Sequence, residues 1–296
     1  MLEETNVVEL ADLGVLSVRG ADAVQFLQGQ LSSDVTQLAA EGSQLCGYHN
    51  PQGRAIAVLR LLEAEGQILA VLPRELVTQV LARLGRFVLR AKVELRDESA
   101  RWRVRGIVQP SAPDGIACAV GGATLRWLAL AAQGAQAAPG PAAPLDAAGE
   151  RRRAWTLLDI ASGLPQVYAR TSEAFVAQML NLDLVNGVAF SKGCYTGQEV
   201  IARAHYRGRV KRRMQRLRTR ERAELAPGAS GRLADGRTYR VVEAAQLADG
   251  RCEFLAVAPL EVRAEPDGEP EPTAPAPLEQ APLEVEALPL PYELPR

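Results

Sequence analysis

The alternation of apolar and polar residues along the chain predicts a mixture of helices and strands. From Pro73 to Gly85 the apolar residues recur at helical spacing, which predicts an amphipathic helix. From Arg86 to Arg96 they occupy every second position, which predicts a half-buried strand. Further strands are expected at 14–19, 44–49, 55–62, 103–109, 116–120 and 124–129. Because hairpin-like turns such as Asn50 to Gly53 join these runs, we expect an α+β fold rather than a doubly wound sheet.

The second half of the chain has a different pattern. Residues 133–149 are rich in Ala, Gly and Pro and predict a flexible loop or linker. Helices are expected at 154–160, 172–180 and 197–206, and strands at 213–219, 238–244 and 252–258. Residues 264–280 are acidic and proline-rich, which predicts a disordered insert, whereas the apolar run 283–292 predicts a last strand. We therefore expect four parts: an α+β region at 1–132, a linker at 133–149, a helical region at 150–208 and a β domain at 209–296.

Composition excludes several classes of protein. The 296 residues carry a formal net charge of -1, and 47% of them are hydrophobic, as in ordinary globular proteins. No apolar run is long enough for a transmembrane helix, and the acidic start of the chain does not resemble a signal peptide. The four cysteines lie far apart without a CxxC pair, so we expect reduced thiols, a cytoplasmic location and no cysteine-based metal site. The sequence also lacks the glycine-rich phosphate-binding motifs of nucleotide-binding folds.

The segment Ser191 to Arg203 carries the strongest candidate chemistry. Thr196 and Glu199 have the spacing of a capping box, which predicts that a helix begins at about Gly197. Cys194 then lies just outside a helix N-terminus and close to Lys192, and both features favour a thiolate. Cys194 is therefore the candidate reactive thiol, although a small buried filler would give the same pattern. In the same way, Glu199 is either a functional carboxylate or only a capping group.

Lys-Gly-Cys-Tyr-Thr-Gly-Gln-Glu, followed by Ala202-Arg203, resembles the signature of the YgfZ family. These folate-binding proteins are linked to iron–sulfur protein maturation and tRNA modification, and they are relatives of the glycine-cleavage T-protein, an aminomethyltransferase. The run from Gly20 to Val35 also resembles the folate domain of this family, and the resemblance extends roughly from Ala11 to Ala258. It implies a three-lobed fold around a central hole that binds tetrahydrofolate, with a small C-terminal β-barrel.

The resemblance also implies candidate binding residues. Trp155 lies in a segment similar to the one that supplies a folate-contacting tryptophan, and a flat indole can stack on a pterin ring. The alternative is a tryptophan of the hydrophobic core. The family's other folate-contacting tryptophan corresponds to Leu13 here, which is a departure from its pattern. The full candidate set for the folate site is Trp155, Lys192, Tyr195, Gln198, Glu199, Arg203, Gln178 and Asn181.

Three functions remain open on the sequence. The first is a tetrahydrofolate-binding accessory protein for the maturation or repair of iron–sulfur enzymes, which would meet client or assembly proteins and affect tRNA modification indirectly. In that case Cys194 has a redox, cluster-transfer or adduct role. The second is a folate-dependent one-carbon transferase that uses Asp159 or Asp183 as the carboxylate near the folate. The third is an RNA-binding module that uses the arginine-rich segment 203–220, in which the arginines could equally cover a core face.

Overall fold

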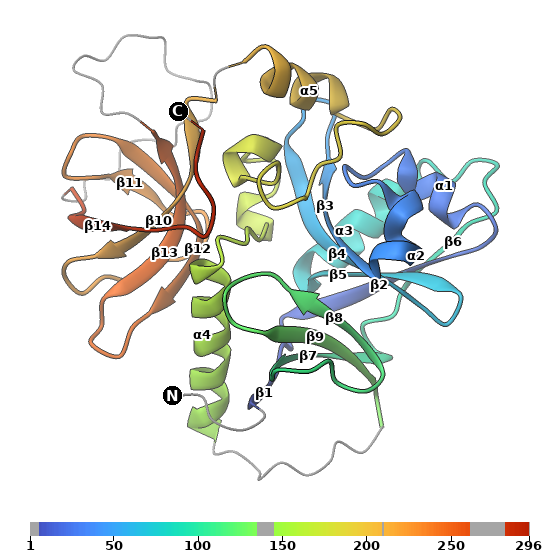
Figure 1. The fold of residues 1–296 in the computed structure, drawn as a ribbon, viewed down its shortest axis with the longest axis horizontal. Coiled ribbons are helices and arrows are strands. Elements are labelled where there is room, and N and C mark those ends of the chain that lie inside the picture. The colour runs from blue at the N-terminus through green and yellow to red at the C-terminus, as the bar shows by residue number, and fades with distance from the viewer. Residues whose placement is uncertain (1–5, 135–144, 209, 261–281, 296) are drawn as a thin grey trace.

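The computed structural model of the protein describes residues 6–134, 145–208, 210–260 and 282–295. The expected insert 264–280, Arg209 and most of the expected linker lie outside these described residues. The described strands form three antiparallel sheets, and helices pack between and around them (Figure 1). This mixed architecture confirms the α+β fold class. Of the described helices, none combines the length and apolar character needed to cross a bilayer.

The first sheet holds the largest core of the protein. Its strand order is β3 (Ser43–His49), β4 (Ala55–Ala64), β5 (Gln67–Pro73), β2 (Leu13–Arg19) and β6 (Glu94–Asp97). Around it lie α1 (Ala23–Gln28), η1 (Val35–Gln37), α2 (Leu38–Glu41) and α3 (Arg74–Gly85). The expected turn between β3 and β4 is confirmed, because Asn50 Oδ1 accepts hydrogen bonds from the backbone N–H groups of Gln52 and Arg54, each at 3.0 Å. The expected helix after Pro73 is also confirmed, and it buries Leu76, Val77, Val80 and Leu84.

The expected strand over 86–96 is wrong for most of its length. Only β6 is extended, and it pairs with β2 from Arg19–Glu94 to Leu16–Asp97. β2 ends at Arg19, and Gly20 follows with a φ of 117°, where an added Cβ would lie 2.0 Å from the carbonyl oxygen of Lys92. Residues 86–93, between α3 and β6, form turns and bends, and Leu89 is 85% exposed. The apolar residues do alternate, but only the part of the segment that forms β6 pairs with another strand.

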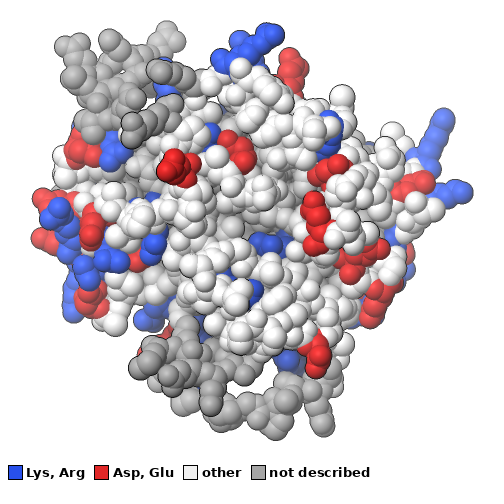
Figure 2. Space-filling view, viewed as in Figure 1, with Lys and Arg blue, Asp and Glu red and all other residues white. Residues whose placement is uncertain are grey.

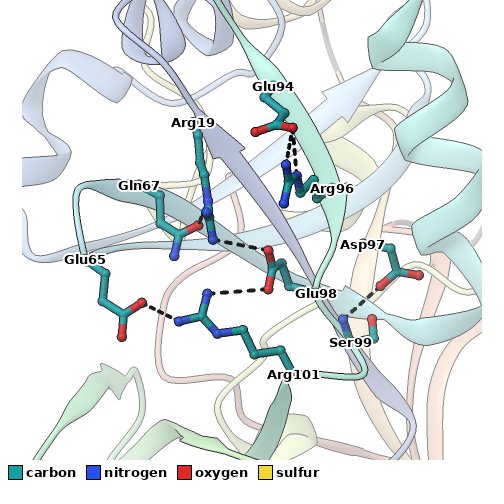
Figure 3. Close-up of polar contacts among 9 residues, drawn as sticks. All are labelled: Arg19, Glu65, Gln67, Glu94, Arg96, Asp97, Glu98, Ser99 and Arg101. Atoms are coloured by element: carbon teal, nitrogen blue, oxygen red, sulfur yellow. Dashed lines mark hydrogen bonds and ion pairs between the residues drawn. The ribbon is translucent and has the colours of Figure 1, made fainter.

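The second sheet has the order β1 (Asn6–Glu9), β7 (Trp102–Val108), β9 (Arg126–Ala132) and β8 (Ile116–Val120). The chain enters it from β6 through a charged cluster shown in Figure 3. Glu98 accepts from Arg19 at 3.2 Å and faces Arg101 at 3.6 Å, and Arg101 also pairs with Glu65 at 2.7 Å. Because Glu98 is only 8% exposed, this carboxylate joins the two sheets at a point where water has little access.

The third sheet forms the C-terminal lobe. Its order is β11 (Ser230–Arg232), β12 (Thr238–Gln246), β13 (Cys252–Pro259), β10 (Arg212–Thr219) and β14 (Val285–Leu288). The expected last strand is confirmed as β14, which pairs with β10. The sheet curls until Leu233 and Leu283 meet in a single parallel bridge between its edges. It is therefore not a closed barrel, because a continuous ladder does not join the edge strands among the described residues.

Helical segments connect the sheets. Helix α4 (Leu145–Ala161) packs against β1, β12 and β13, and it is longer than expected because it includes the end of the predicted linker (Figure 1). The helix expected at 172–180 is wrong: the chain forms only the short 3-10 helices η2 (Ala169–Thr171) and η3 (Ala177–Leu180). Left-handed residues interrupt a longer helix here, since Glu173 and Asn181 have φ values of 61° and 55°. Helix α5 (Gln198–Tyr206) follows.

A buried carboxylate lies where the third sheet meets the helical region. Glu243 on β12 is 7% exposed, and its Oε2 accepts a hydrogen bond from Tyr168 Oη at 2.5 Å. Burial, with a small contribution from the Asp159 carboxylate, raises the pKa of Glu243 to about 7, although Tyr168 and Arg152 favour the charged form. The folded protein therefore binds this proton more tightly than the unfolded chain does.

We expect the parent protein to lose stability as pH rises through about 7, and we expect Glu243→Gln to abolish this loss. The pKa of Glu243 is raised in the folded state, so its contribution is fully present below its usual pKa of 4.5 and is lost as pH rises through about 7. The full difference corresponds to about 3 kcal/mol, and glutamine keeps an acceptor for Tyr168 without a charge. Urea unfolding at about pH 5 and about pH 8 measures the effect. Parallel pH dependences in the parent and the variant would contradict this assignment.

Candidate functional site

An open cavity of about 840 Å³ lies between the first two sheets, the loop 185–189 and the segment that follows β14. Its wall includes parts of β3 and β4, the turn between β8 and β9, the end of α4, the loop 185–189 and residues 291–292. The polar side chains in this wall are Ser33, Asp34, Glu41, Ser43, Gln44, Arg60, Ser162, Asn186 and Tyr292. Distant parts of the chain thus supply the wall of one site.

The charged groups of the cavity are arranged for a ligand with several polar groups. Asp34 accepts from Thr36 Oγ1 at 2.6 Å and from Gln28 Nε2 at 2.9 Å, and the hydrogen bond from Thr36 is the main cause of its lowered pKa. Glu41 accepts from Gln44 Nε2 at 2.9 Å. Arg60 makes a long contact, 3.5 Å, from Nη1 to the carbonyl oxygen of Ala119 and lies beside the Cys118 thiol, and no described carboxylate lies within ion-pair distance of it. The Arg60 guanidinium is therefore available for an anion.

The lysine of the signature segment holds one wall of this cavity. Lys192 Nζ donates to the carbonyl oxygens of Gln28 at 2.8 Å, Leu31 at 2.7 Å and Ser33 at 2.7 Å. Burial lowers the pKa of Lys192 to about 8, so the ammonium stays protonated at neutral pH and uses all three of its N–H groups. Lys192 thus fixes the loop that carries Ser33 and Asp34. The Lys192 side chain itself lies behind the cavity wall and is not part of it.

Two other signature residues have different environments. Tyr195 is 7% exposed, and the Lys192 Nζ atom lies 5.0 Å from the centre of its ring. Burial raises the pKa of Tyr195 to about 12, so its hydroxyl remains protonated. Cys194 is exposed, whereas Cys46, Cys118 and Cys252 are buried. The alternative of Cys194 as a buried filler is therefore wrong.

Helix α5 begins differently from the expected capping box. Its N-cap is Gly197 with a φ of 83°, no side chain caps the helix, and Glu199 is exposed. An added Cβ at Gly197 would lie 2.5 Å from the carbonyl oxygen of Asn50, so the helix start packs directly on the β3–β4 turn. A side chain would therefore not fit at Gly197, whereas Gly193 faces open space. Gln198 is half-buried at the first helical position, and Arg203 is exposed.

Gln178 and Asn181 lie behind the site, between η3, α5 and β10. Gln178 Nε2 donates to the Ile201 carbonyl oxygen at 2.7 Å, and Asn181 Nδ2 donates to the Met214 carbonyl oxygen at 2.8 Å. Both side chains are almost fully buried and are not among the cavity-lining residues. Asn181 reaches the wall indirectly, through a 3.3 Å contact with Tyr292 Oη.

Trp155 also supports the cavity from behind. It is 4% exposed, its ring covers Gly106, and the Arg126 guanidinium lies 4.9 Å from its centre. Arg126 in turn donates to Ser162 Oγ at 3.1 Å and to the Gly121 carbonyl oxygen at 3.3 Å, and both of these residues line the cavity. Leu13, at the position of the family's second tryptophan, packs against the same core cluster. In this structure the indole is a core group whose position affects the wall through Arg126.

The two candidate carboxylates of a transferase are held in ion pairs. Asp159 pairs with Arg126 at 2.6 Å. Asp183 accepts two hydrogen bonds from Arg213, at 2.9 Å and 3.0 Å, with both side chains at most 6% exposed. Neither aspartate is among the residues that line the cavity.

The arginines of β10 are mainly structural. Arg216 pairs with Glu253 at 2.6 Å, and Arg218 pairs with the same carboxylate at 3.4 Å. Met214 and Leu217 are fully buried, as the alternative reading of this segment predicted. The arginine-rich segment is therefore not one continuous basic surface; Arg203, Arg207 and Lys211, which precede β10, remain exposed.

The sequence analysis missed most of the residues that line the cavity. Arg60 is the charged residue in the otherwise apolar run 55–62, and this departure from the apolar pattern could have marked it as a site residue. Tyr292 lies in a segment that was expected only as a strand. Asp34, Gln44 and Asn186 have no local pattern that sets them apart, because the contacts that bring them together join distant parts of the chain.

No protein-family model matches the sequence. The chain is 34% identical over 278 residues to the tRNA-modifying protein YgfZ of Edwardsiella ictaluri, covering 85% of this chain and 83% of the relative. It is 32% identical to the protein of the same name from Serratia proteamaculans, over 82% of this chain and 81% of the relative. Among solved structures, aminomethyltransferase T of the glycine cleavage system from Bartonella henselae has a similar fold, with a TM-score of 0.62, 13% identity, and coverage of 86% and 78% of the two chains.

Proposed function

The chain belongs to the YgfZ family, and on this premise we propose that it is a tetrahydrofolate-binding accessory protein for the maturation or repair of iron–sulfur enzymes that act in tRNA modification. The fold is that of the glycine-cleavage T-protein. The observation that carries the proposal is the open cavity of about 840 Å³, whose wall combines residues of the first two sheets, the loop 185–189 and the C-terminal residues 291–292. A cavity of this size falls in the range of about 300 to 1,000 Å³ that is usual for small-molecule sites.

The chemistry of the wall fits a folate. The Arg60 guanidinium would take a carboxylate of the glutamate tail, since no described acidic residue pairs with it. The carboxylates of Asp34 and Glu41 would accept from the amino and ring N–H groups of a pterin, and the Tyr292 ring offers an aromatic surface. When bound, tetrahydrofolate would carry one-carbon units on its ring nitrogens. The chain's own residues would bind and orient it.

The accessory function is favoured over the one-carbon transferase. The carboxylates that the sequence offered for a transferase, Asp159 and Asp183, are engaged by Arg126 and Arg213 and do not line the cavity. The two carboxylates of the wall already accept hydrogen bonds, Asp34 from Thr36 and Gln28 and Glu41 from Gln44. We infer that the role of Asp159 and Asp183 is to hold the fold. The exposed Cys194 would then act on a client rather than on the folate, as a redox, cluster-transfer or adduct-forming thiol.

We propose transfer or repair rather than storage of a cluster. Clusters of this kind usually have about four protein ligands, whereas one cysteine is exposed among the described residues. Burial raises the pKa of Cys46 to about 12 and that of Cys252 to about 11, so these thiols are unreactive at neutral pH. Iron–sulfur client or assembly proteins are the partners that this function requires.

We expect Arg60→Gln to weaken tetrahydrofolate binding at least about tenfold, since a charge-assisted hydrogen bond contributes roughly 1.5 to 3 kcal/mol. Isothermal titration calorimetry with the full chain measures this. Arg220→Gln is the matched control, because that side chain is 66% exposed on the C-terminal sheet. Failure of the parent protein to bind any reduced folate would overturn the folate proposal, and equal affinities of parent and Arg60→Gln would remove Arg60 from it.

The role of Cys194 is tested separately. In cells that lack the endogenous protein, we expect Cys194→Ser to leave tRNA modification defective, whereas Cys252→Ser restores it because that thiol is buried. The measurement is the content of modified nucleosides in total tRNA. The purified Cys194→Ser variant should retain folate binding. Full restoration by Cys194→Ser would exclude the thiol function and leave the folate proposal intact.

A further inference from the structure

An aromatic cluster lies at the C-terminal end of α5. Phe190 and His205 stack with ring centres 3.7 Å apart and an interplanar angle of 17°. Tyr206 meets the edge of this pair, 4.8 Å from His205 and 6.1 Å from Phe190. Tyr206 is 68% exposed, which is unusual for a tyrosine that already has two ring neighbours. His205 and Tyr206 are neighbours in the sequence, and the fold adds the ring of Phe190.

Exposed cations surround the cluster. Arg203 lies three residues before Tyr206 on the same face of α5, and Arg207 follows Tyr206 as the residue at which the helix ends. Lys211 follows just beyond the helix and is also exposed. Within the described part of the chain, no carboxylate lies within ion-pair distance of these three cations, in contrast to Arg213, Arg216 and Arg218 on β10.

This surface carries an excess of positive charge, although the whole chain has a formal net charge of -1. The protein as a whole therefore has no general attraction for anions. Figure 2 shows basic side chains at the top of the molecule, over the position of α5 in Figure 1. Glu199, one turn earlier on the same helix face, is the acidic residue nearest in sequence to this group. The positive charge is therefore concentrated at the C-terminal half of the helix.

We propose that this surface, formed by Phe190, Arg203, His205, Tyr206, Arg207 and Lys211, binds single-stranded nucleic acid. Exposed aromatic rings beside free guanidinium groups are the combination that single strands require, because bases stack on the rings and phosphates pair with the cations. Tyr206 and the stacked His205 receive a base, and Arg203 and Arg207 contact the flanking phosphates. No residue of α5 lines the central cavity, so this site is independent of the proposed folate site.

The same features argue against an acidic protein as the occupant. A stable protein interface usually buries about 1,200 to 2,000 Å² around a desolvated apolar centre. On α5 the exposed large apolar side chains are Val200 and Tyr206, and Val200 is only 40% exposed. A single strand needs much less continuous apolar surface, since each base uses one ring.

The test is fluorescence anisotropy of labelled oligonucleotides of about 12 nucleotides, one of RNA and one of DNA, with the full chain at low salt. We expect Tyr206→Ala to weaken binding at least about fivefold, while Tyr206→Phe retains it because the ring stays. Arg203→Gln with Arg207→Gln should reduce the slope of log affinity against log salt by about 1.4, the value for two phosphate contacts on a single strand. Arg220→Gln is the control and should leave both quantities unchanged.

The outcomes separate the alternatives. Tighter binding of RNA than of DNA would identify RNA as the source of the single strand, and the reverse order would identify DNA. Absence of binding at low salt would overturn the proposal, as would binding that is insensitive to Tyr206→Ala. Equal competition by polyglutamate against the parent and Tyr206→Ala would indicate an acidic protein surface and would also overturn it. Tetrahydrofolate binding should be unchanged in all of these variants, so failure here is distinguishable from failure of the folate proposal.

Discussion

Replacing Arg213 by methionine will destabilise the protein by about 3 to 5 kcal/mol, which is the usual result of removing one partner of a buried ion pair. Arg213 is 4% exposed and donates two hydrogen bonds to Asp183, and its Nη1 also reaches the carbonyl oxygen of Gln178 at 3.1 Å and Asn181 Oδ1 at 3.3 Å. The substitution leaves the Asp183 carboxylate buried without a counter-charge, and it also removes the two contacts from Arg213 to Gln178 and Asn181.

Urea unfolding of four proteins measures this coupling: the parent, Arg213→Met, Asp183→Asn and the double variant. The double variant should be more stable than Arg213→Met, because the neutral amide no longer requires a cation. Arg216→Met is a suitable comparison on the same strand, since the Arg216 side chain is 18% exposed and retains access to water. A loss below about 1 kcal/mol in Arg213→Met would show that water reaches Asp183 and that the pair is not effectively buried.

Replacing Lys192 by methionine will lower the free energy of unfolding by about 2 to 4 kcal/mol and will also weaken tetrahydrofolate binding. Methionine occupies a similar volume but leaves the carbonyl oxygens of Gln28, Leu31 and Ser33 without the donor they share. The loop that carries Ser33 and Asp34 then loses its anchor, although Lys192 itself does not line the cavity.

Hydrogen exchange of residues 28–34, together with folate calorimetry, separates the two effects. Protection should fall first in this loop, and Lys92→Met should change neither quantity because that side chain is exposed. If folate binding is lost while the loop remains as protected as in the parent, Lys192 contacts the ligand directly and its interpretation as a loop anchor is wrong.

The sequence predicted elements well where local pattern and packing agree. The helix after Pro73, the turn from Asn50 to Gly53 and the β10 face with Met214 and Leu217 follow from residue spacing alone. Prediction from the sequence failed where a contact with a distant part of the chain decides the local conformation. The helix start at Gly197 is set by the Asn50 carbonyl rather than by Thr196 and Glu199, so the local capping pattern was misleading.

The candidate site could likewise be predicted only in part from the sequence. The signature segment marked the residues that hold the site together, among them Lys192, which is bonded to carbonyls about 160 residues earlier in the chain. It did not mark the cavity wall, since Arg60, Gln44 and Tyr292 come from three separate strands or segments. Backbone carbonyls are present at every position, so no sequence pattern shows which of them accept the Lys192 donors.

The position of Tyr292 has a consequence for the order in which the protein becomes functional during translation. Tyr292 Oη donates to the carbonyl oxygen of Gly163 at 2.8 Å, and the residue closes one side of the cavity. Residues 291–292 leave the ribosome after the other described parts of the wall have been made. A nascent chain can thus fold its first two sheets early, yet it presents a complete cavity only once residues 291–292 have emerged and docked. Ligand capture would then report that this segment has been made and is in place.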